Sequence, residues 1–445
     1  MKYYSTNGNA PIATLEKAVV KGLAEDRGLY MPERINKLPQ EFFDNIQDMK
    51  FQDIAYNVAS AFFGEDVDLD ALQDLVYDTL SFDCPVVKVS DSIYSLELFH
   101  GPTLAFKDVG ARFMARLLRY FTSTTSDTGS TRLINVLVAT SGDTGSAVAN
   151  GFLGVDGIHV YVLYPKGKVS PIQECQFTTL GQNITAIEVD GVFDDCQRLV
   201  KSAFMDEELN QHMMLTSANS INVARFLPQA FYYFNAYARM KALGLADNLV
   251  MCVPSGNFGN ICSALFGHAM GLPIKRFIAA NNANDIFYKY LLTAKYEPKA
   301  SVQTLANAMD VGDPSNFARI INLYSQNGQL SEAETHAAIV SLISGATYTD
   351  EEIKETMRRC YQETGYILDP HGACGYQALA DGLLPGEIGV FCETAHPAKF
   401  KEKVDSILDI DVDIPERLQA FMRGEKQSVP MTKEFADFKA YLLNQ

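Results

Sequence analysis

Lys107 is the residue of this sequence whose type and surroundings most directly suggest chemistry. It follows three apolar residues in the run HGPTLAFKD and lies at the start of a predicted helix, DVGARFMARLLRYF. A lysine in this position is either an ordinary solvated residue or a partly desolvated amine whose lowered pKa would let it react with an aldehyde. The segment by itself leaves both interpretations open.

A turn that contains two glycines has the properties of an anion site. The apolar run NLVMCVP leads into Ser255-Gly256-Asn257-Phe258-Gly259-Asn260, and a predicted helix follows. Glycines let the backbone approach a ligand, and the free amides at the start of a helix favour a bound phosphate. The turn has neither the G-x-G-x-x-G pattern nor the G-K-[ST] ending of the common nucleotide motifs. A tight connection that binds nothing is the alternative.

A second turn, Thr140-Ser141-Gly142-Asp143-Thr144, follows the apolar run LINVLVA. Its hydroxyl groups at a helix start would suit the carboxylate of a small substrate, although N-capping by Ser141, Asp143 or Thr144 would explain each residue singly. A candidate reactive lysine together with a phosphate-binding turn indicates pyridoxal phosphate, whose aldehyde binds a lysine and whose phosphate needs amide donors.

Four motifs occur in a fixed order along the chain. They are H-G-P-T-L-A-F-K-D from residue 100, T-S-G-D-T-G-S-A from residue 140, S-G-N-F-G-N from residue 255 and E-T-A-H-P-A-K-F from residue 393. With Tyr4-Ser5-Thr6 and GLAEDRGLYMPE near the N-terminus, the chain resembles the threonine synthase family over nearly its whole length. That family belongs to fold type II of the pyridoxal-phosphate enzymes, the class of the tryptophan synthase β subunit.

The resemblance assigns roles to particular residues. It implies that Lys107 is the catalytic residue and forms the Schiff base with the cofactor, and that Thr394 contacts the pyridine nitrogen. The cofactor phosphate would lie in the turn formed by Gly256, Asn257, Phe258, Gly259 and Asn260. The substrate would be bound through its carboxylate by Thr140, Ser141 and Thr144, and through its phosphate by the segment that contains Asn219, Ser220 and Arg225.

Asp143 departs from the pattern of many fold type II relatives, in which this turn often carries an asparagine near the phenolic oxygen of the cofactor. Two anionic oxygens would repel each other, so a direct contact between Asp143 and the cofactor is not expected. His100, His371 and His396 lie near the motifs and titrate in a range that suits proton transfer, but a role for each is left open.

The reaction implied by the resemblance is conversion of O-phospho-L-homoserine and water to L-threonine and phosphate, the last step of threonine biosynthesis. The nearest alternative is another fold type II lyase, such as a serine/threonine deaminase-like enzyme or a phospholyase that releases a keto acid. A non-catalytic protein that binds a phosphorylated amino acid or a partner is the alternative from a different class, and Lys107 argues against it.

The elements that must position these residues follow from the periodicity of apolar residues. From residue 86, β-rich runs alternate with helical segments, which is typical of parallel sheets. The resemblance implies an α/β fold with two parallel-sheet αβα lobes flanking a cofactor cleft, plus a mostly helical N-terminal accessory lobe. We expect that lobe at 1–85, a cofactor-binding region at 86–400 with a mobile small lobe at about 125–230, and a C-terminal helical extension at 401–445.

Composition limits the possible partners. The 54 acidic and 37 basic residues give a formal charge of −17, which argues against nucleic-acid binding. No apolar run approaches the ~18 residues of a membrane span, and the N-terminus lacks a secretory signal pattern. The eight cysteines form no C-x-x-C pair, so we expect no metal site. We expect a cytoplasmic monomer or homodimer that acts on a small molecule.

Overall fold

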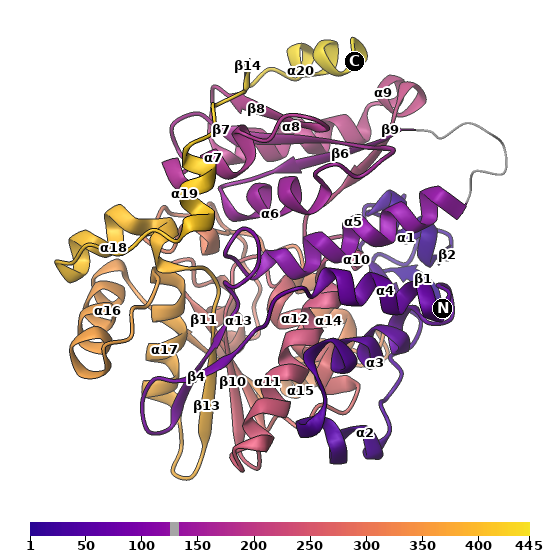
Figure 1. Cartoon of the computed structure of the whole chain (residues 1–445). Coiled ribbons are helices and arrows are strands. Elements are labelled where there is room, and N and C mark those ends of the chain that lie inside the picture. The colour runs from indigo at the N-terminus through magenta and orange to yellow at the C-terminus, as the bar shows by residue number, and fades with distance from the viewer. Residues whose placement is uncertain (125–132) are drawn as a thin grey trace.

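The computed structural model describes residues 1–124 and 133–445. Residues 125–132, where the expected mobile lobe begins, lie outside the described residues. Two sheets organise the larger part of the chain, and Figure 1 shows one above the other with helices around each. This arrangement confirms the predicted architecture of two αβα lobes and an N-terminal accessory lobe.

The larger lobe is built on a six-stranded sheet. Its strands are β4 (Val86–Lys88), β5 (Ile93–Glu97), β10 (Leu249–Pro254), β11 (Arg276–Asn281), β12 (Ile343–Thr347) and β13 (Ile388–Glu393). The strand order is β12-β11-β10-β13-β5-β4, and all neighbours are parallel except β4, which is antiparallel to β5. Every residue of β10 is buried, as expected for a strand in the middle of a sheet with helices on both faces.

The smaller lobe has a five-stranded sheet that is parallel throughout. Its strands are β6 (Ile134–Ala139), β7 (Ile158–Pro165), β8 (Ile184–Val189), β9 (Met214–Ser217) and β14 (Val429–Met431). The strand order is β14-β8-β7-β6-β9. The sequence pattern predicts helices in the C-terminal extension but not the edge strand β14.

Helices connect the strands of both lobes. In the smaller lobe and its junction they are α5 (Lys107–Thr124), α6 (Asp143–Phe152), α7 (Pro171–Thr178), α8 (Phe193–Met205), α9 (Glu207–His212), α10 (Val223–Phe226) and η2 (Leu227–Gln229). In the larger lobe they are α11 (Ala230–Ala242), α12 (Gly259–Ala269), α13 (Ile286–Thr293), η3 (Asn307–Met309), α14 (Phe317–Tyr324), α15 (Glu332–Leu342), α16 (Asp350–Thr364), α17 (Pro370–Gly382), η4 (Pro397–Phe400) and α18 (Lys401–Leu408).

The N-terminal lobe combines a small sheet with helices. Its elements are β1 (Lys2–Ser5), β2 (Ala13–Thr14), α1 (Leu15–Lys21), β3 (Tyr30–Pro32), α2 (Gln40–Asn45), η1 (Ile46–Asp48), α3 (Phe51–Phe63) and α4 (Leu69–Thr79). The three strands pair antiparallel in the order β2-β1-β3. The lobe is therefore mostly helical, as predicted, and carries in addition a sheet that the pattern did not predict.

The C-terminal segment runs from the larger lobe onto the smaller one. It contains α19 (Glu416–Met422), β14 and α20 (Phe435–Leu443). In Figure 1 this segment, drawn in yellow, passes α7 and ends with α20 above the smaller sheet. Phe438 and Leu442 of α20 are fully buried in the smaller lobe's core. No helix in the described ranges has the length and apolar character needed to cross a membrane.

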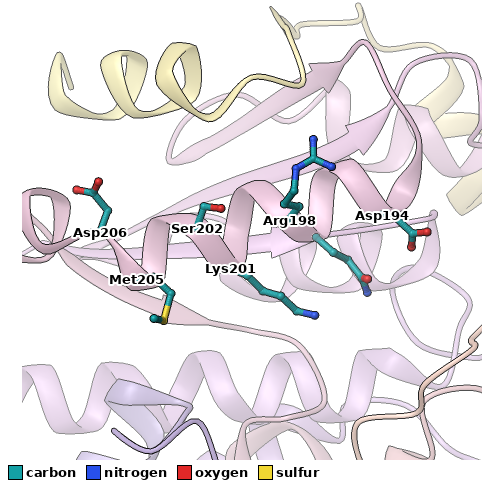
Figure 2. A pocket seen from close by; sticks show the side chains of 7 residues that line it. Asp194, Arg198, Lys201, Ser202, Met205 and Asp206 are labelled. Atoms are coloured by element: carbon teal, nitrogen blue, oxygen red, sulfur yellow. The ribbon is translucent and has the colours of Figure 1, made fainter. Parts of the chain in front are cut away.

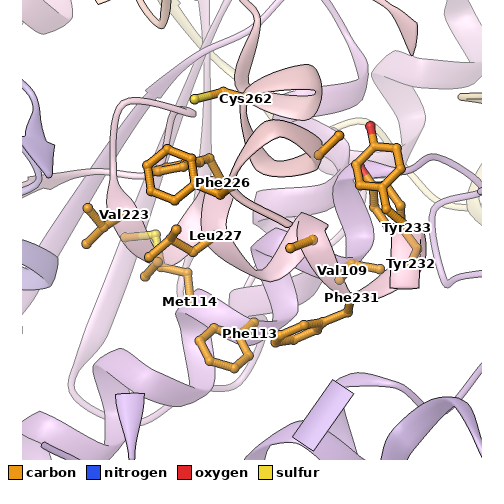
Figure 3. Close-up of a cluster of buried hydrophobic side chains, with 14 of the residues drawn as sticks. Val109, Phe113, Met114, Val223, Phe226, Leu227, Phe231, Tyr232, Tyr233 and Cys262 are labelled. Atoms are coloured by element: carbon orange, nitrogen blue, oxygen red, sulfur yellow. The ribbon is translucent and has the colours of Figure 1, made fainter. Parts of the chain in front are cut away.

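The helix that begins at Lys107 is held in the main core. Val109, Phe113 and Met114 of α5 belong to the same buried cluster as Phe226, Leu227 and Phe231 (Figure 3). Phe113 and Phe231 contact edge to face, with their ring centroids 5.6 Å apart. Close packing of this kind leaves few alternative side-chain positions, so the N-terminal end of α5 is fixed relative to both sheets.

Candidate active site

The loop before α5 is folded back onto the first turn of this helix. The Asp108 carboxylate accepts hydrogen bonds from the Thr103 amide (2.9 Å) and the Thr103 hydroxyl (2.6 Å). A side chain at Gly101 would place its Cβ 2.5 Å from this carboxylate, so only glycine fits there. These contacts hold Lys107 at the first position of α5.

A short antiparallel bridge joins this loop to the end of β13. The Phe106 amide donates to the Thr394 carbonyl (2.8 Å), and the His396 amide donates to the Leu104 carbonyl (3.0 Å). The predicted site residues Lys107 and Thr394 are therefore brought together, although they are far apart in the sequence. The Thr394 hydroxyl forms no hydrogen bond within the described residues, so it is free to bind a ligand.

The surroundings of Lys107 change its acidity. Burial lowers the pKa of the Lys107 ammonium to about 8, with a raising contribution from the charge of Asp143 and lowering contributions from Arg225 and Lys399. The ammonium also lies 5.5 Å from the centroid of the Phe106 ring. The unprotonated fraction of the amine near neutral pH is therefore much larger than that of an ordinary lysine, as a nucleophilic or basic lysine requires.

The turn at 256–260 presents unbonded amides. The backbone N–H groups of Gly256, Asn257, Phe258, Gly259 and Asn260 donate to no acceptor in the described parts of the chain. The turn is tight, since Phe258 has a left-handed conformation (φ 64°), and a Cβ on Gly256 would lie 2.7 Å from the Ala308 carbonyl oxygen. Unsatisfied amides at the start of α12 form a site for an anion such as a phosphate.

Side chains of the same turn hold its neighbours in place. The Asn260 amide donates to the Pro254 carbonyl at the end of β10 (2.8 Å). The Asn257 amide donates to the Ser220 hydroxyl (2.9 Å) and its carbonyl oxygen accepts from the Ser315 amide (2.7 Å). Among the five residues predicted to bind the cofactor phosphate, Asn257 and Asn260 thus use their side chains to stabilise the turn and leave their backbone amides free.

The smaller lobe contributes the turn after β6. The Thr140 hydroxyl accepts hydrogen bonds from the amides of Gly142 (2.9 Å) and Gly145 (2.8 Å), so its oxygen stabilises the turn. Gly142 has φ 145° and a Cβ there would lie 2.6 Å from the Gln173 amide group, which only glycine permits. The hydroxyls of Ser141 and Thr144 make no hydrogen bond in the ranges that the structure describes, and both residues are partly exposed.

The segment at 219–225 connects the two turns. The Asn219 amide group donates to the Ala139 carbonyl at the end of β6 (3.4 Å), while the Ser220 hydroxyl accepts from Asn257. Arg225 is 2% exposed and donates from Nη1 to the Ala218 carbonyl (2.7 Å). Its Nε has no hydrogen-bond partner, and burial lowers the pKa of this guanidinium to about 10. No carboxylate in the described ranges forms an ion pair with it, which leaves it able to bind an anion.

Lys399 completes the site and was not singled out from the sequence. Its ammonium forms an ion pair with Asp143 (2.5 Å) in which both side chains are buried. Burial by itself would raise the pKa of the Asp143 carboxyl, but the charges of Lys399 and Lys107 and two hydrogen bonds lower it to about 2. Lys399 belongs to the last of the four motifs, yet nothing local marks it as the partner of a residue in the second.

Arg319 is a second residue that the sequence did not indicate. It donates to the carbonyls of Tyr30 (3.1 Å), Ser220 (3.1 Å) and Ile221 (2.6 Å), and its guanidinium lies 4.1 Å from the centroid of the Phe226 ring. Arg319 therefore links the N-terminal lobe to the segment that carries Ser220. Its role is structural because its donors are directed to these backbone carbonyls and to the Asn316 side chain (2.7 Å).

The three histidines differ in their partners. His371 Nδ1 lies 2.5 Å from the Asp369 carboxylate, and its Nε2 accepts from the Ala308 amide (3.1 Å), which is the arrangement of a neutral ring that fixes the backbone beside Gly256. His396 Nδ1 accepts from the Ala398 amide (3.1 Å), and burial lowers its pKa to about 4. His100 is partly exposed and bonds to Glu97 (2.8 Å). The rings of His371 and His396 thus each use one nitrogen to accept a hydrogen bond from a backbone amide.

A separate hollow of about 660 Å³ lies over α8 and contains none of the predicted site residues. Figure 2 shows Arg198, Lys201 and Ser202 projecting from this helix. The full lining consists of Asp194, Gln197, Arg198, Lys201, Ser202, Met205 and Asp206. This hollow is open to solvent and lies apart from the turns described above, so the candidate active site is the buried group around Lys107.

Comparison with known proteins gives full-length matches. The family model described as "Pyridoxal-phosphate dependent enzyme" matches residues 85–392, "Threonine synthase N terminus" matches 2–80 and "Threonine synthase, C-terminal" matches 372–442. The threonine synthase of Haemophilus influenzae is 43% identical over 443 residues, which cover 100% of both chains.

Solved structures agree with these matches. A crystal structure of threonine synthase from Escherichia coli superimposes with a TM-score of 0.90 and 40% identity, with 100% of each chain covered. A threonine synthase from Brucella melitensis with bound PLP has a TM-score of 0.92 and 33% identity, and the match covers 100% of this chain and 99% of that one. The similarity thus includes the N-terminal lobe and the C-terminal segment as well as the two central lobes.

Proposed function

The chain belongs to the threonine synthase family of pyridoxal-phosphate-dependent enzymes, and from this premise we propose that it converts O-phospho-L-homoserine and water to L-threonine and inorganic phosphate. The observation that carries the proposal is the presence of two anion-binding features beside one reactive lysine. The free amides at 256–260 suit the cofactor phosphate. Arg225, which is buried and forms no ion pair with a carboxylate of residues 1–124 or 133–445, suits the phosphate of the substrate.

The cofactor residues are assigned by position. Lys107 would bind the cofactor aldehyde, the amides at 256–260 would hold its phosphate, and the Thr394 hydroxyl would be the partner of its pyridine nitrogen. When bound, pyridoxal phosphate supplies an aldehyde carbon that binds amino groups and a ring that withdraws electrons from the α carbon of the substrate. A neutral hydroxyl at Thr394 leaves the pyridine nitrogen largely unprotonated, which moderates that withdrawal.

The chain's own residues carry out the binding and proton transfers. The hydroxyls of Thr140, Ser141 and Thr144 bind the substrate carboxylate, and Arg225, Ser220 and Asn219 bind its phosphate. Lys107 Nζ, with its pKa near 8, removes the α proton and becomes an ammonium. A β proton is then lost to the departing phosphate as the Cγ–O bond breaks. The Lys107 ammonium gives its proton to Cγ, which makes Cβ electrophilic. Water then adds its hydroxyl at Cβ while Lys107 takes the remaining water proton, and return of this proton to Cα gives threonine.

A product assay tests this function. The purified protein is incubated with pyridoxal phosphate and O-phospho-L-homoserine, and phosphate, threonine and 2-oxobutyrate are measured. We expect equal amounts of phosphate and threonine. Phosphate with 2-oxobutyrate in place of threonine would contradict the proposal and favour a phospholyase.

Replacement of the lysine tests the assignment of Lys107. Lys107→Ala should abolish turnover and leave the circular dichroism spectrum unchanged. The matched control is Lys354→Ala, which removes an exposed lysine paired with Glu351 (2.7 Å) and should keep full activity. Turnover by Lys107→Ala would refute the assignment.

We further propose a cytoplasmic monomer or homodimer. All eight cysteines are free thiols, and all except Cys175 are buried, which is typical of proteins from a reducing compartment. Gel filtration with light scattering measures the assembly, and a larger oligomer would contradict this part of the proposal.

A further inference from the structure

The ion pair between Asp143 and Lys399 is buried and crosses between the lobes. Asp143 is the first residue of α6 in the smaller lobe, whereas Lys399 lies in η4, directly after Thr394 and β13 of the larger lobe. The side chain of Lys399 is 0% exposed and that of Asp143 is 4% exposed, with 2.5 Å between Nζ and Oδ1. Few charge pairs in this protein are so completely removed from solvent.

Neutral groups complete the coordination of the pair. Gln173 donates to the Asp143 carboxylate (2.9 Å), and Lys399 also donates to the Thr103 carbonyl (2.8 Å). Ser170, at the start of α7, donates to the Lys399 backbone carbonyl (3.2 Å). Thr103 is the same residue that binds Asp108, the neighbour of Lys107. The pair is therefore connected to the loop that positions the reactive lysine.

Stability gives a weak reason for burying such a pair. Removing two charges from water is costly, and well-packed apolar residues in their place are often neutral or stabilising. A pair at this position therefore calls for a functional explanation. Its distinguishing feature is its location, since Asp143 and Lys399 both act electrostatically on Lys107, with opposite signs.

We propose that Lys399 is a positioning residue that cancels the charge of Asp143, so that this carboxylate can hold the turn after β6 at the active site without acting as a net negative charge on Lys107 and the bound cofactor. This inference rests on the proposed function and extends it. Because the two charges cancel, the turn carries no net charge towards Lys107.

The charged groups that face Lys107 determine what each substitution does. They are Asp143 from α6, Lys399 from η4 and Arg225 from α10, while Asp108 on the same helix is occupied by Thr103. Loss of Lys399 leaves an uncompensated carboxylate, which favours the protonated form of the Lys107 nitrogen, both as an amine and as an imine. Loss of the Asp143 charge leaves the Lys399 ammonium uncompensated, and its positive charge disfavours protonation of the Lys107 nitrogen. Arg225 stays in place in every variant, so differences between variants report on the pair.

The test uses Lys399→Met, Asp143→Asn and the double variant, each reconstituted with pyridoxal phosphate. The pH titration of the absorbance band of the bound cofactor and the pH dependence of kcat/KM are measured. Relative to the unsubstituted protein, we expect the titration midpoint to rise by about 1–3 units in Lys399→Met and to fall by a similar amount in Asp143→Asn. In the double variant, where both charges are gone, the midpoint should return to within about half a unit of the original.

Controls separate this effect from a general loss of structure. Lys399→Arg keeps the charge and should keep the midpoint. Lys439→Met with Asp206→Asn removes a remote Lys–Asp pair (2.8 Å) on the outer side of the smaller lobe and should shift nothing. If Lys399→Met fails to fold, Asp143→Asn and the double variant still carry the test, because the second substitution must reverse the shift caused by the first.

Shifts of both single variants in the same direction, or a double variant that stays shifted, would overturn the inference. This failure is distinct from failure of the proposed function. If the protein binds the cofactor and shows the reciprocal shifts but forms no threonine, the substrate assignment is wrong and the role of the pair stands. If it forms threonine without the reciprocal shifts, the role of the pair is wrong and the function stands.

Discussion

Three buried cations near the active site differ in what compensates their charge. Lys399 pairs with Asp143, and Arg319 donates to three backbone carbonyls over the face of Phe226. Arg225 donates to a single carbonyl and keeps Nε unbonded. A buried charge without a partner is costly, so the structure tolerates Arg225 at a cost to stability that binding of an anion would offset.

Arg225→Met should therefore reduce catalysis without reducing stability. Loss of a charged hydrogen bond to the substrate phosphate costs about 1.5–3 kcal/mol, which is roughly a 10- to 150-fold loss of kcat/KM. The melting temperature should stay the same or rise, since an unpaired buried charge is removed. Arg423→Met, at an exposed pair with Glu416, is the control. An unchanged kcat/KM for phosphohomoserine would refute the assignment.

The lowered pKa of Lys107 predicts how the cofactor is captured. Free amine, and not ammonium, adds to an aldehyde, so the rate of cofactor capture by the apoprotein should rise with pH and level off above about 8. An ordinary lysine, with a pKa near 10.4, would give a rate that still rises at pH 10. Stopped-flow absorbance from pH 6 to 10 distinguishes these outcomes, and a midpoint above 10 would contradict the burial of this amine.

The turn between β10 and α12 is held from behind by the 3-10 helix η3. His371 accepts from the Ala308 amide and is itself bound to Asp369, which caps α17. Because this support is made of backbone and buried side chains, it cannot move aside easily. Position 256 must therefore be glycine because the neighbouring backbone of η3 leaves no room for a Cβ, in addition to any requirement of the ligand.

Gly256→Ala should weaken cofactor binding. Its Cβ would meet the Ala308 carbonyl at 2.7 Å and Met309 Cα at 2.9 Å, both of them backbone atoms. Overpacking of this kind costs about 1–3 kcal/mol, so the Kd for pyridoxal phosphate should rise roughly 5- to 150-fold. Gly382→Ala meets only the end of the Ile278 side chain at 3.3 Å and should bind normally. Equal affinity in both variants would show that the turn can shift.

Across the whole molecule, the outer segments are coupled to the active site by buried contacts. The C-terminal segment adds β14 to the smaller sheet and covers it with α20. The N-terminal lobe reaches the site through Arg319, which joins the Tyr30 carbonyl to those of Ser220 and Ile221. Both ends of the chain therefore contribute to the geometry of the central lobes.

Arg319→Met should destabilise the protein, in contrast to Arg225→Met. It leaves the buried Tyr30 carbonyl and the partly buried Ser220 and Ile221 carbonyls without this donor. An unsatisfied buried group costs about 1–3 kcal/mol, so unfolding should be easier by about 2 kcal/mol or more. Urea denaturation measures this difference, and hydrogen exchange should show faster exchange near residues 219–222. A loss of activity with unchanged stability would instead indicate that Arg319 contacts a ligand.

Much of the fold and of the candidate site is predictable from local sequence patterns. Apolar runs that end in glycine turns identify β6 and β10 and the loops that follow them, because strand periodicity and glycine conformations are set within about ten residues. The motif around Lys107 leaves two interpretations of this lysine open, and only its combination with the turn at 255–260 predicts a lysine that binds a cofactor. The antiparallel strands β1 to β3 and the edge strand β14 are missed because they are short and form only through their partners.

By itself, the sequence determined the family, most of the helices and strands of the two central lobes, and the four motifs whose side chains could take part in chemistry. The tertiary structure alone decided which of them meet. Strand β13, which comes last in the chain among the strands of the larger sheet, inserts between β10 and β5, and this places Thr394 beside Lys107 and brings Lys399 to Asp143. No local pattern encodes that insertion, since the order of strands in a sheet depends on which buried faces fit together once distant segments have folded.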